Sequence, residues 1–167
     1  RIAAGADPIG IVFEDDFALP PGGAGTLRAL VDWLAGRDDW DLVNLGANKH
    51  RIYSPLTTFG DHALTRAHYF PMTTTGLIWS RAGAQAFVAH HQTIFAPVDN
   101  YFRHWQTRRN RGLALWPPLV GTTGAESEVF AGHRSREGRH PFYGLIKQRR
   151  LMVDKFLALR HKFGRSR

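Results

Sequence analysis

The amino-acid sequence predicts an α/β fold in which a sheet is flanked by helices. Three observations near the amino-terminal end lead to this prediction. An apolar run at residues 9–13 is followed by helical apolar spacing at 27–34 and by a second strand-like segment at 41–45. A strand, a helix and a strand in this order indicate a layered α/β fold, because parallel neighbouring strands need a crossover connection.

The first three elements follow from local pattern. Residues 9–13 are rich in branched apolar side chains, which is typical of a strand buried on both faces of a parallel sheet. The helix is predicted to end at Gly36, since its apolar residues repeat at i, i+3, i+4 and i+7: Leu27, Leu30, Val31 and Leu34. The next strand, 41–45, is predicted to end at Gly46.

The middle of the chain alternates polar and apolar segments. Residues 47–66 contain Pro55, Gly60 and several threonines, and we interpret them as a loop of the kind that lines active sites. A third strand is predicted at 74–79, and Ser80 is suited to cap a helix after it. A further helix is expected to begin near Pro97, with one apolar face made by Val98, Tyr101, Phe102 and Trp105.

The carboxy-terminal part divides into a strand, a connection and a helix. The strand is predicted at 113–116, stopped by two prolines, and 121–139 reads as a loop or poorly ordered connection. From Phe142 onward an apolar stripe predicts a long helix whose other face carries Lys147, Arg150, Lys155 and Lys162. We therefore expect an α/β domain at 1–140 and a basic amphipathic helical tail at 141–167.

Composition narrows the classes of function. The chain has 167 residues and a hydrophobic fraction of 43%, which suits one domain with a real core. Its formal net charge of +8 favours anionic partners such as nucleic acid, phospholipid or a nucleotide diphosphate. Because the sequence has no cysteine, it has no disulfide, thiolate metal site or cysteine nucleophile. No apolar run approaches the roughly 20 residues that span a bilayer.

Three adjacent acids, Glu14, Asp15 and Asp16, follow the first predicted strand. Adjacent carboxylates repel one another unless they are solvated or share a cation. Period-two alternation would place Glu14 and Asp16 on one side of the strand end, where ligands bind in open α/β sheets. Two such carboxylates suit Mg²⁺ or Mn²⁺, which bridge to phosphate oxygens. A solvated acidic turn is the alternative.

The order of segments resembles glycosyltransferase family 25, the lipopolysaccharide-type sugar transferases. Four blocks carry the resemblance, namely IVFEDD at 11–16, WDLVNLG at 40–46, TGLIWSRAGA at 75–84, and PVD at 97–99 with PPLV at 117–120. Each block is weakly specific, whereas their order and spacing together are fairly specific. The resemblance spans most of residues 9–129.

The resemblance implies a partial GT-A-like (Rossmann-like) mixed sheet and a site at the three acids. It implies that Glu14 and Asp16 bind Mn²⁺ or Mg²⁺, and that Glu14, Asp15 and Asp16 hold a nucleotide-diphosphate sugar such as a UDP-sugar. It also implies inversion, with Asp99 as the catalytic base, although an N-cap role is the alternative for Asp99. The family's amino-terminal strand and helix have no counterpart here, so the segment is truncated or genuinely absent.

Two other segments are weaker candidates. One of Lys49, His50 and Arg51, which follow the second strand, is placed to meet a diphosphate, with an ordinary polar loop as the alternative. Residues 126–129 resemble the family's late acid-Ser-acid segment, with a solvated loop as the alternative.

The expected function is transfer of a hexose from a nucleotide-diphosphate sugar to a saccharide or lipid-linked acceptor, as in bacterial cell-surface glycan synthesis. The expected location is cytoplasmic, with peripheral contact at an anionic inner membrane, and no nucleic acid partner is expected. Two alternatives stay open: a basic binding module for anionic membrane or nucleic acid, and a degenerate transferase without activity. Interleaved aromatic and basic residues at 101–105 superficially favour nucleic acid, but their helical spacing assigns the aromatics to a core.

Overall fold

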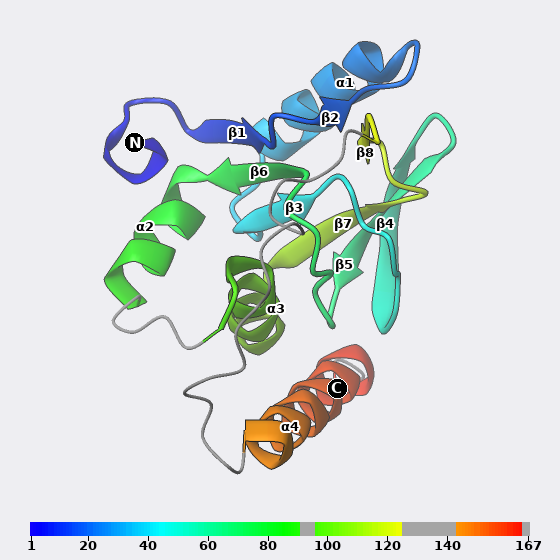
Figure 1. Ribbon diagram of the computed structural model, residues 1–167. Coiled ribbons are helices and arrows are strands. Elements are labelled where there is room, and N and C mark those ends of the chain that lie inside the picture. The colour runs from blue at the N-terminus through cyan, green and yellow to red at the C-terminus, as the bar shows by residue number, and fades with distance from the viewer. Residues whose placement is uncertain (91–95, 125–142, 165–167) are drawn as a thin grey trace.

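The computed structural model describes residues 1–90, 96–124 and 143–164. The predicted α/β class is confirmed. Within the described ranges, a mixed six-stranded sheet has the strand order β1-β6-β3-β7-β5-β4, and a two-stranded ladder joins β2 to β8 (Figure 1). The large sheet comprises β1 (Ile9–Phe13), β3 (Leu42–Asn44), β4 (Tyr53–Phe59), β5 (His62–Ala67), β6 (Gly76–Ser80) and β7 (Gly112–Trp116). The ladder comprises β2 (Phe17–Ala18) and β8 (Gly121–Thr122).

Helices cover both faces of the large sheet. One face packs on α1 (Gly23–Ala35), and the other on α2 (Arg81–His90) and α3 (Val98–Arg109), while α4 (Tyr143–Phe163) lies against α3 (Figure 1). A short 3-10 turn, η1 (Ile2–Ala4), lies beside α2. Period-two alternation along each buried strand supplies both cores, as in β7, where Leu113 and Leu115 face the α1 side and Ala114 faces the other.

Three local predictions are confirmed. Helix α1 ends at Ala35 with Gly36 as its cap, and both Leu30 and Leu34 are buried. Ser80 caps α2, because its Oγ accepts a hydrogen bond from the amide of Gly83 at 2.9 Å. In α3 the aromatic residues Tyr101 and Trp105 are buried, although Val98, predicted on the same face, is 55% exposed.

The expectation of a parallel sheet buried on both faces is wrong for β1. Among the strands that the structure describes, only β3 and β7 pair in parallel, and β1 lies at the sheet edge, paired antiparallel with β6. Ile11 and Val12, which point to opposite faces, are 39% and 45% exposed. A branched apolar run predicts a strand but does not fix its position in the sheet.

The predicted loop at 47–66 is also wrong in its larger part. Residues from Tyr53 onward form an antiparallel hairpin of β4 and β5, closed at Gly60, whose positive φ of 57° suits a residue without a side chain. Pro55 is tolerated because β4 is an edge strand. On the solvent side of an edge strand there is no neighbouring strand, so the amide hydrogen that proline lacks is not needed there. Of the predicted connection at 121–139, the structure describes 121–124; residues 126–129 and Phe142 lie outside the described residues.

Candidate active site

Two strand ends meet at one edge of the sheet. Strands β1 and β3 flank β6, and both are antiparallel to it, so their carboxyl ends lie at the same edge. Glu14 follows β1 there, and Asn44 ends β3. This edge is where ligands bind in open α/β sheets.

The segment 73–75 joins these two ends. The hydroxyl of Thr74 donates a hydrogen bond to Oε1 of Glu14, and the Glu14 amide donates to the carbonyl of Thr75 at 3.1 Å. On the other side, Nδ2 of Asn44 donates to the carbonyl of Thr73 at 2.6 Å. Glu14 is thereby held at a defined position by residues that the sequence did not single out.

The three acids lie in a turn rather than along an extended strand. Strand β1 ends at Phe13, and the amide of Phe17 donates to the carbonyl of Glu14 at 3.3 Å, closing the turn. The rings of Phe13 and Phe17 stack across it at 4.2 Å. Period-two alternation therefore does not describe Glu14 and Asp16, and that part of the prediction is wrong.

The backbone of Asp16 is hydrogen-bonded to the residue that follows β8, the strand that pairs with β2. Its carbonyl accepts a hydrogen bond from the amide of Thr123 at 2.8 Å, next to the pairing of Phe17 with Thr122. Glu14 and Asp15 are exposed and Asp16 is half-buried. In residues 1–90, 96–124 and 143–164, no group of three or more histidine or acidic residues is placed to hold a metal ion.

The acid turn fits a cation of a particular kind. Carboxylate oxygens are hard ligands that suit Mg²⁺ or Mn²⁺. Mg²⁺ usually keeps several waters and binds through one or two carboxylates and the phosphates of its substrate. Glu14 and Asp16 provide carboxylates in a solvent-accessible turn, which suits such an open site and not a cage made wholly of protein ligands.

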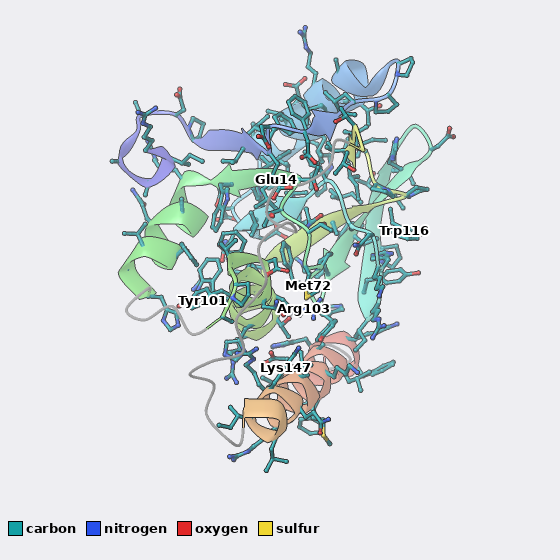
Figure 2. The ribbon with its side chains drawn as sticks, viewed as in Figure 1. Glu14, Met72, Tyr101, Arg103, Trp116 and Lys147 are labelled. Carbon is teal, nitrogen blue, oxygen red and sulfur yellow. The ribbon has the colours of Figure 1, made fainter. Side chains whose placement is uncertain are left out.

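A basic cavity lies on the α3 side of the sheet, and Arg103 of α3 is part of its lining. Its volume is about 210 Å³, and its lining contains cations but no acid: Asn48, Lys49, Arg51, Tyr69, Phe70, Pro71, Met72 and Arg103. Figure 2 shows Met72 and Arg103 next to each other in the middle of the molecule. Met72 precedes Thr74 by two residues, so a single segment borders the cavity and holds Glu14.

Arg103 reaches the cavity from α3 and is fixed by its neighbours. Its Nε donates to the carbonyl of Phe70 at 3.3 Å, and its guanidinium lies 5.0 Å from the centre of the Tyr69 ring. Burial lowers the pKa of Arg103, and the positive charge of Arg51 lowers it further, while Tyr69 and Asp99 oppose this shift. Arg103 stays protonated, since an arginine pKa begins so far above neutrality. Two mutually repelling cations at one cavity favour an anionic ligand.

Asp99 does not line the basic cavity, but it lies close enough to Arg103 for its charge to act on that residue. It lies in the first turn of α3, one turn before Arg103, and its charge acts on that guanidinium. The N-cap interpretation is wrong, because the cap position is Pro97 and Oδ1 of Asp99 accepts from the adjacent Asn100 amide at 2.7 Å. Across the described residues, no hydrogen bond or ion pair connects Asp99 with Glu14, Asp15 or Asp16.

The three candidate residues at 49–51 do not all lie at the same place. Lys49 and Arg51 line the cavity, whereas His50 turns toward the β4–β5 hairpin. Its ring stacks on Tyr53 at 3.7 Å, and its Nε2 forms a hydrogen bond with the hydroxyl of Thr65 at 2.9 Å. Burial lowers the pKa of His50 from 6.5 to about 4, so the ring is neutral near pH 7. His50 therefore has a structural position.

Neither a family model nor a curated protein matches this chain. The functional conclusion therefore depends on the geometry of these residues and on the resemblance carried by the four sequence blocks.

Proposed function

We propose that this chain is a metal-dependent hexosyltransferase domain that uses a nucleotide-diphosphate sugar, with a UDP-sugar as the donor. The observation that carries the proposal is the common edge of β1 and β3. Carboxylates of Glu14 and Asp16 lie at one strand end, and the segment after the other strand leads into a cavity lined by Lys49, Arg51 and Arg103. A diphosphate needs both a cation site and positive charge, and the acid turn and the basic cavity would supply one each.

In this proposal the acid turn is the cation site of a GT-A-like domain. Glu14 and Asp16 would hold Mn²⁺ or Mg²⁺, and Asp15 would border the nucleotide. When bound, the cation would neutralise charge on the diphosphate leaving group. The hydrogen bond from Thr74 fixes one Glu14 oxygen and leaves the carboxylate open to solvent on its other side.

Asp99 is the proposed base. Its carboxylate would accept the proton of an acceptor hydroxyl, whose oxygen attacks the anomeric carbon. The bond from that carbon to the diphosphate oxygen breaks, and the diphosphate leaves with the electron pair, which inverts configuration. Arg103 lies one helical turn from Asp99 and would help to orient the anionic leaving group.

The test is release of UDP from UDP-hexoses with Mn²⁺ or with EDTA. The parent chain should release UDP only with the cation. Asp16→Asn should abolish release, while Asp61→Asn, an exposed acid at the tip of the β4–β5 hairpin, should not. Equal release by the parent and Asp16→Asn, or release unaffected by EDTA, would contradict the proposal.

A second candidate is a binding module, and the structure favours only one form of it. Tyr101 and Trp105 are buried in the core beside Trp79, so neither is available to stack on nucleotide bases. This removes the feature that suggested nucleic acid. The remaining form is a membrane-binding module, because α4 exposes both apolar and basic side chains.

A further inference from the structure

Helix α4 packs on the domain through a polar contact. Its Asp154 is 1% exposed, and Oδ2 of that residue lies 2.9 Å from Nδ1 of His104 on α3. Nε of Arg108 lies 3.8 Å from the other oxygen of Asp154, and Ala158, one turn further along α4, is fully buried. In an ordinary amphipathic helix a charged residue such as Asp154 faces water. In α4 this residue is buried against α3 instead.

The apolar stripe of α4 faces outward instead. Met152, Phe156 and Phe163 are 72%, 62% and 66% exposed, and Leu145 is 66% exposed. Their spacings of seven, four and seven residues place all four on one side of the helix. Leu159, three residues after Phe156, borders the same stripe and is 43% exposed. Contiguous exposed apolar side chains of this kind mark an interaction surface.

Positive charge flanks the stripe on both sides. Arg149 and Arg160 lie along one side, each four residues after a member of the stripe, and Lys155 lies along the other. All three are exposed. Asp154 is the single acidic residue between 143 and 164, and it points into the domain. The outward face of α4 therefore combines an apolar centre with basic edges and carries no negative charge.

We propose that this face, Leu145, Met152, Phe156, Leu159 and Phe163 with Arg149, Lys155 and Arg160, binds a bilayer rich in anionic lipid. An apolar stripe between cations matches the boundary between acyl chains and headgroups, where amphipathic helices lie in the plane of the membrane. The phosphates of anionic lipid complement the flanking charges. Within the described ranges no helix is long and apolar enough to cross a bilayer, which fits a helix lying on the surface.

The arrangement of the domain allows such contact. Helix α4 packs against α3 on the side away from the sheet (Figure 1). At its carboxyl end α4 approaches the domain, where Arg160 and Phe163 border a cavity with Asn110. Leu145, Met152 and Phe156 lie along the part of α4 before this end. Figure 2 shows Glu14 and Lys147 well apart, with α3 between them. Membrane binding through α4 would leave the acid turn accessible. The proposal does not depend on the chain being a glycosyltransferase.

Co-sedimentation of the full chain with vesicles tests this inference. One set contains phosphatidylglycerol and phosphatidylcholine, and the other contains phosphatidylcholine alone. The parent should bind the anionic vesicles and bind the neutral ones weakly. Phe156→Ser with Phe163→Ser should weaken binding by more than about tenfold, because the stripe loses its largest side chains.

A matched control and a charge variant complete the test. Val88→Ser changes a side chain on α2 that is 63% exposed and should leave binding unchanged. Arg149→Gln with Arg160→Gln should weaken binding about 30-fold at low salt, whereas Arg1→Gln with Arg28→Gln, exposed elsewhere, should have a much smaller effect. Thermal melts of the variants should match the parent, since the altered side chains are exposed.

Several results would overturn the proposal. Equal binding to anionic and neutral vesicles would exclude the charge-matched surface. Unchanged binding in both the phenylalanine and arginine variants would place lipid contact elsewhere. Sedimentation that shows a dimer lost in the phenylalanine variant, without vesicle binding by the parent, would identify the face as a contact between two copies of this chain.

Discussion

Thr74 donates a hydrogen bond from its hydroxyl to a carboxylate oxygen of Glu14, a residue 60 positions earlier in the chain. This contact fixes the first acid of the turn at the edge shared by β1 and β3. The Glu14 amide is held as well, by the carbonyl of Thr75. A cation site needs ligands in defined positions, and residues that hydrogen-bond to ligands contribute to metal affinity.

Thr74→Val should weaken cation-dependent binding of UDP by about three- to tenfold, because Glu14 loses a hydrogen bond to its charged group. The fold should persist, since the side chain is only half-buried. Calorimetric titration of UDP with Mn²⁺ measures the effect. Thr58→Val, at an exposed position on β4, is the control. Identical affinities for Thr74→Val and the parent would show that the contact does not support the site.

The basic cavity gives a second prediction. Arg51→Gln removes an exposed cation from the lining and should lower UDP affinity by about three- to tenfold at low salt, because a charge-assisted contact is lost. The difference should shrink at high salt, where charges are screened. Arg28→Gln on α1 serves as the control. If Arg51→Gln binds UDP as tightly as the parent at low salt, the cavity does not hold the diphosphate.

The sequence predicted the elements whose signals are local. Helix α1 shows a full apolar repeat with a glycine at its end, and the cap of α2 needs only Ser80 and the amide of Gly83. Long-range pairing left no such signal. Nothing beside Thr74 indicates that it meets Glu14, and the threonine-rich strand β4 resembles a loop because an edge strand needs little apolar character.

The candidate site was predicted only in part, because some of its residues are adjacent in the sequence and others are brought together only by folding. The acidic run was visible as three adjacent letters, whereas the cavity draws on three separated segments, at 48–51, 69–72 and Arg103. Lys49 and Arg51 were candidates from their place after a strand. Arg103 was missed, since a basic residue on an amphipathic helix usually faces solvent and only tertiary packing turns it toward Tyr69.

His50 gives a prediction about pH. Its folded-state pKa of about 4 lies below the ordinary value of 6.5, because burial disfavours the charged ring. The unfolded chain therefore binds a proton that the folded chain does not, so stability from His50 is present above pH 6.5 and is lost as pH falls toward 4. Urea denaturation across this range should show a shallower decline for His50→Gln. Parallel declines in the parent and the variant would contradict this account.

Two glycines form a matched test of packing. A Cβ at Gly83 would lie 2.5 Å from the carbonyl oxygen of Asp41, which is backbone and does not yield easily. Gly83→Ala should therefore cost about 1–3 kcal/mol. Gly25 in α1 has nothing within 4 Å of that position, and Gly25→Ala should stabilise the helix by about 0.5–1 kcal/mol. Chemical denaturation measures both, and opposite signs are expected.

The central claim is that Glu14 and Asp16 bind a divalent cation together with a nucleotide diphosphate. Isothermal titration of UDP into the parent chain and into Asp16→Asn, each with and without Mn²⁺, tests it most directly. The parent should bind UDP more tightly with Mn²⁺ than without it. With Mn²⁺ present, Asp16→Asn should bind UDP at least roughly 10- to 100-fold more weakly than the parent, because even the loss of a residue that supports a metal ligand lowers metal affinity by that factor. Equal UDP affinity in parent and variant with Mn²⁺ present would contradict the claim.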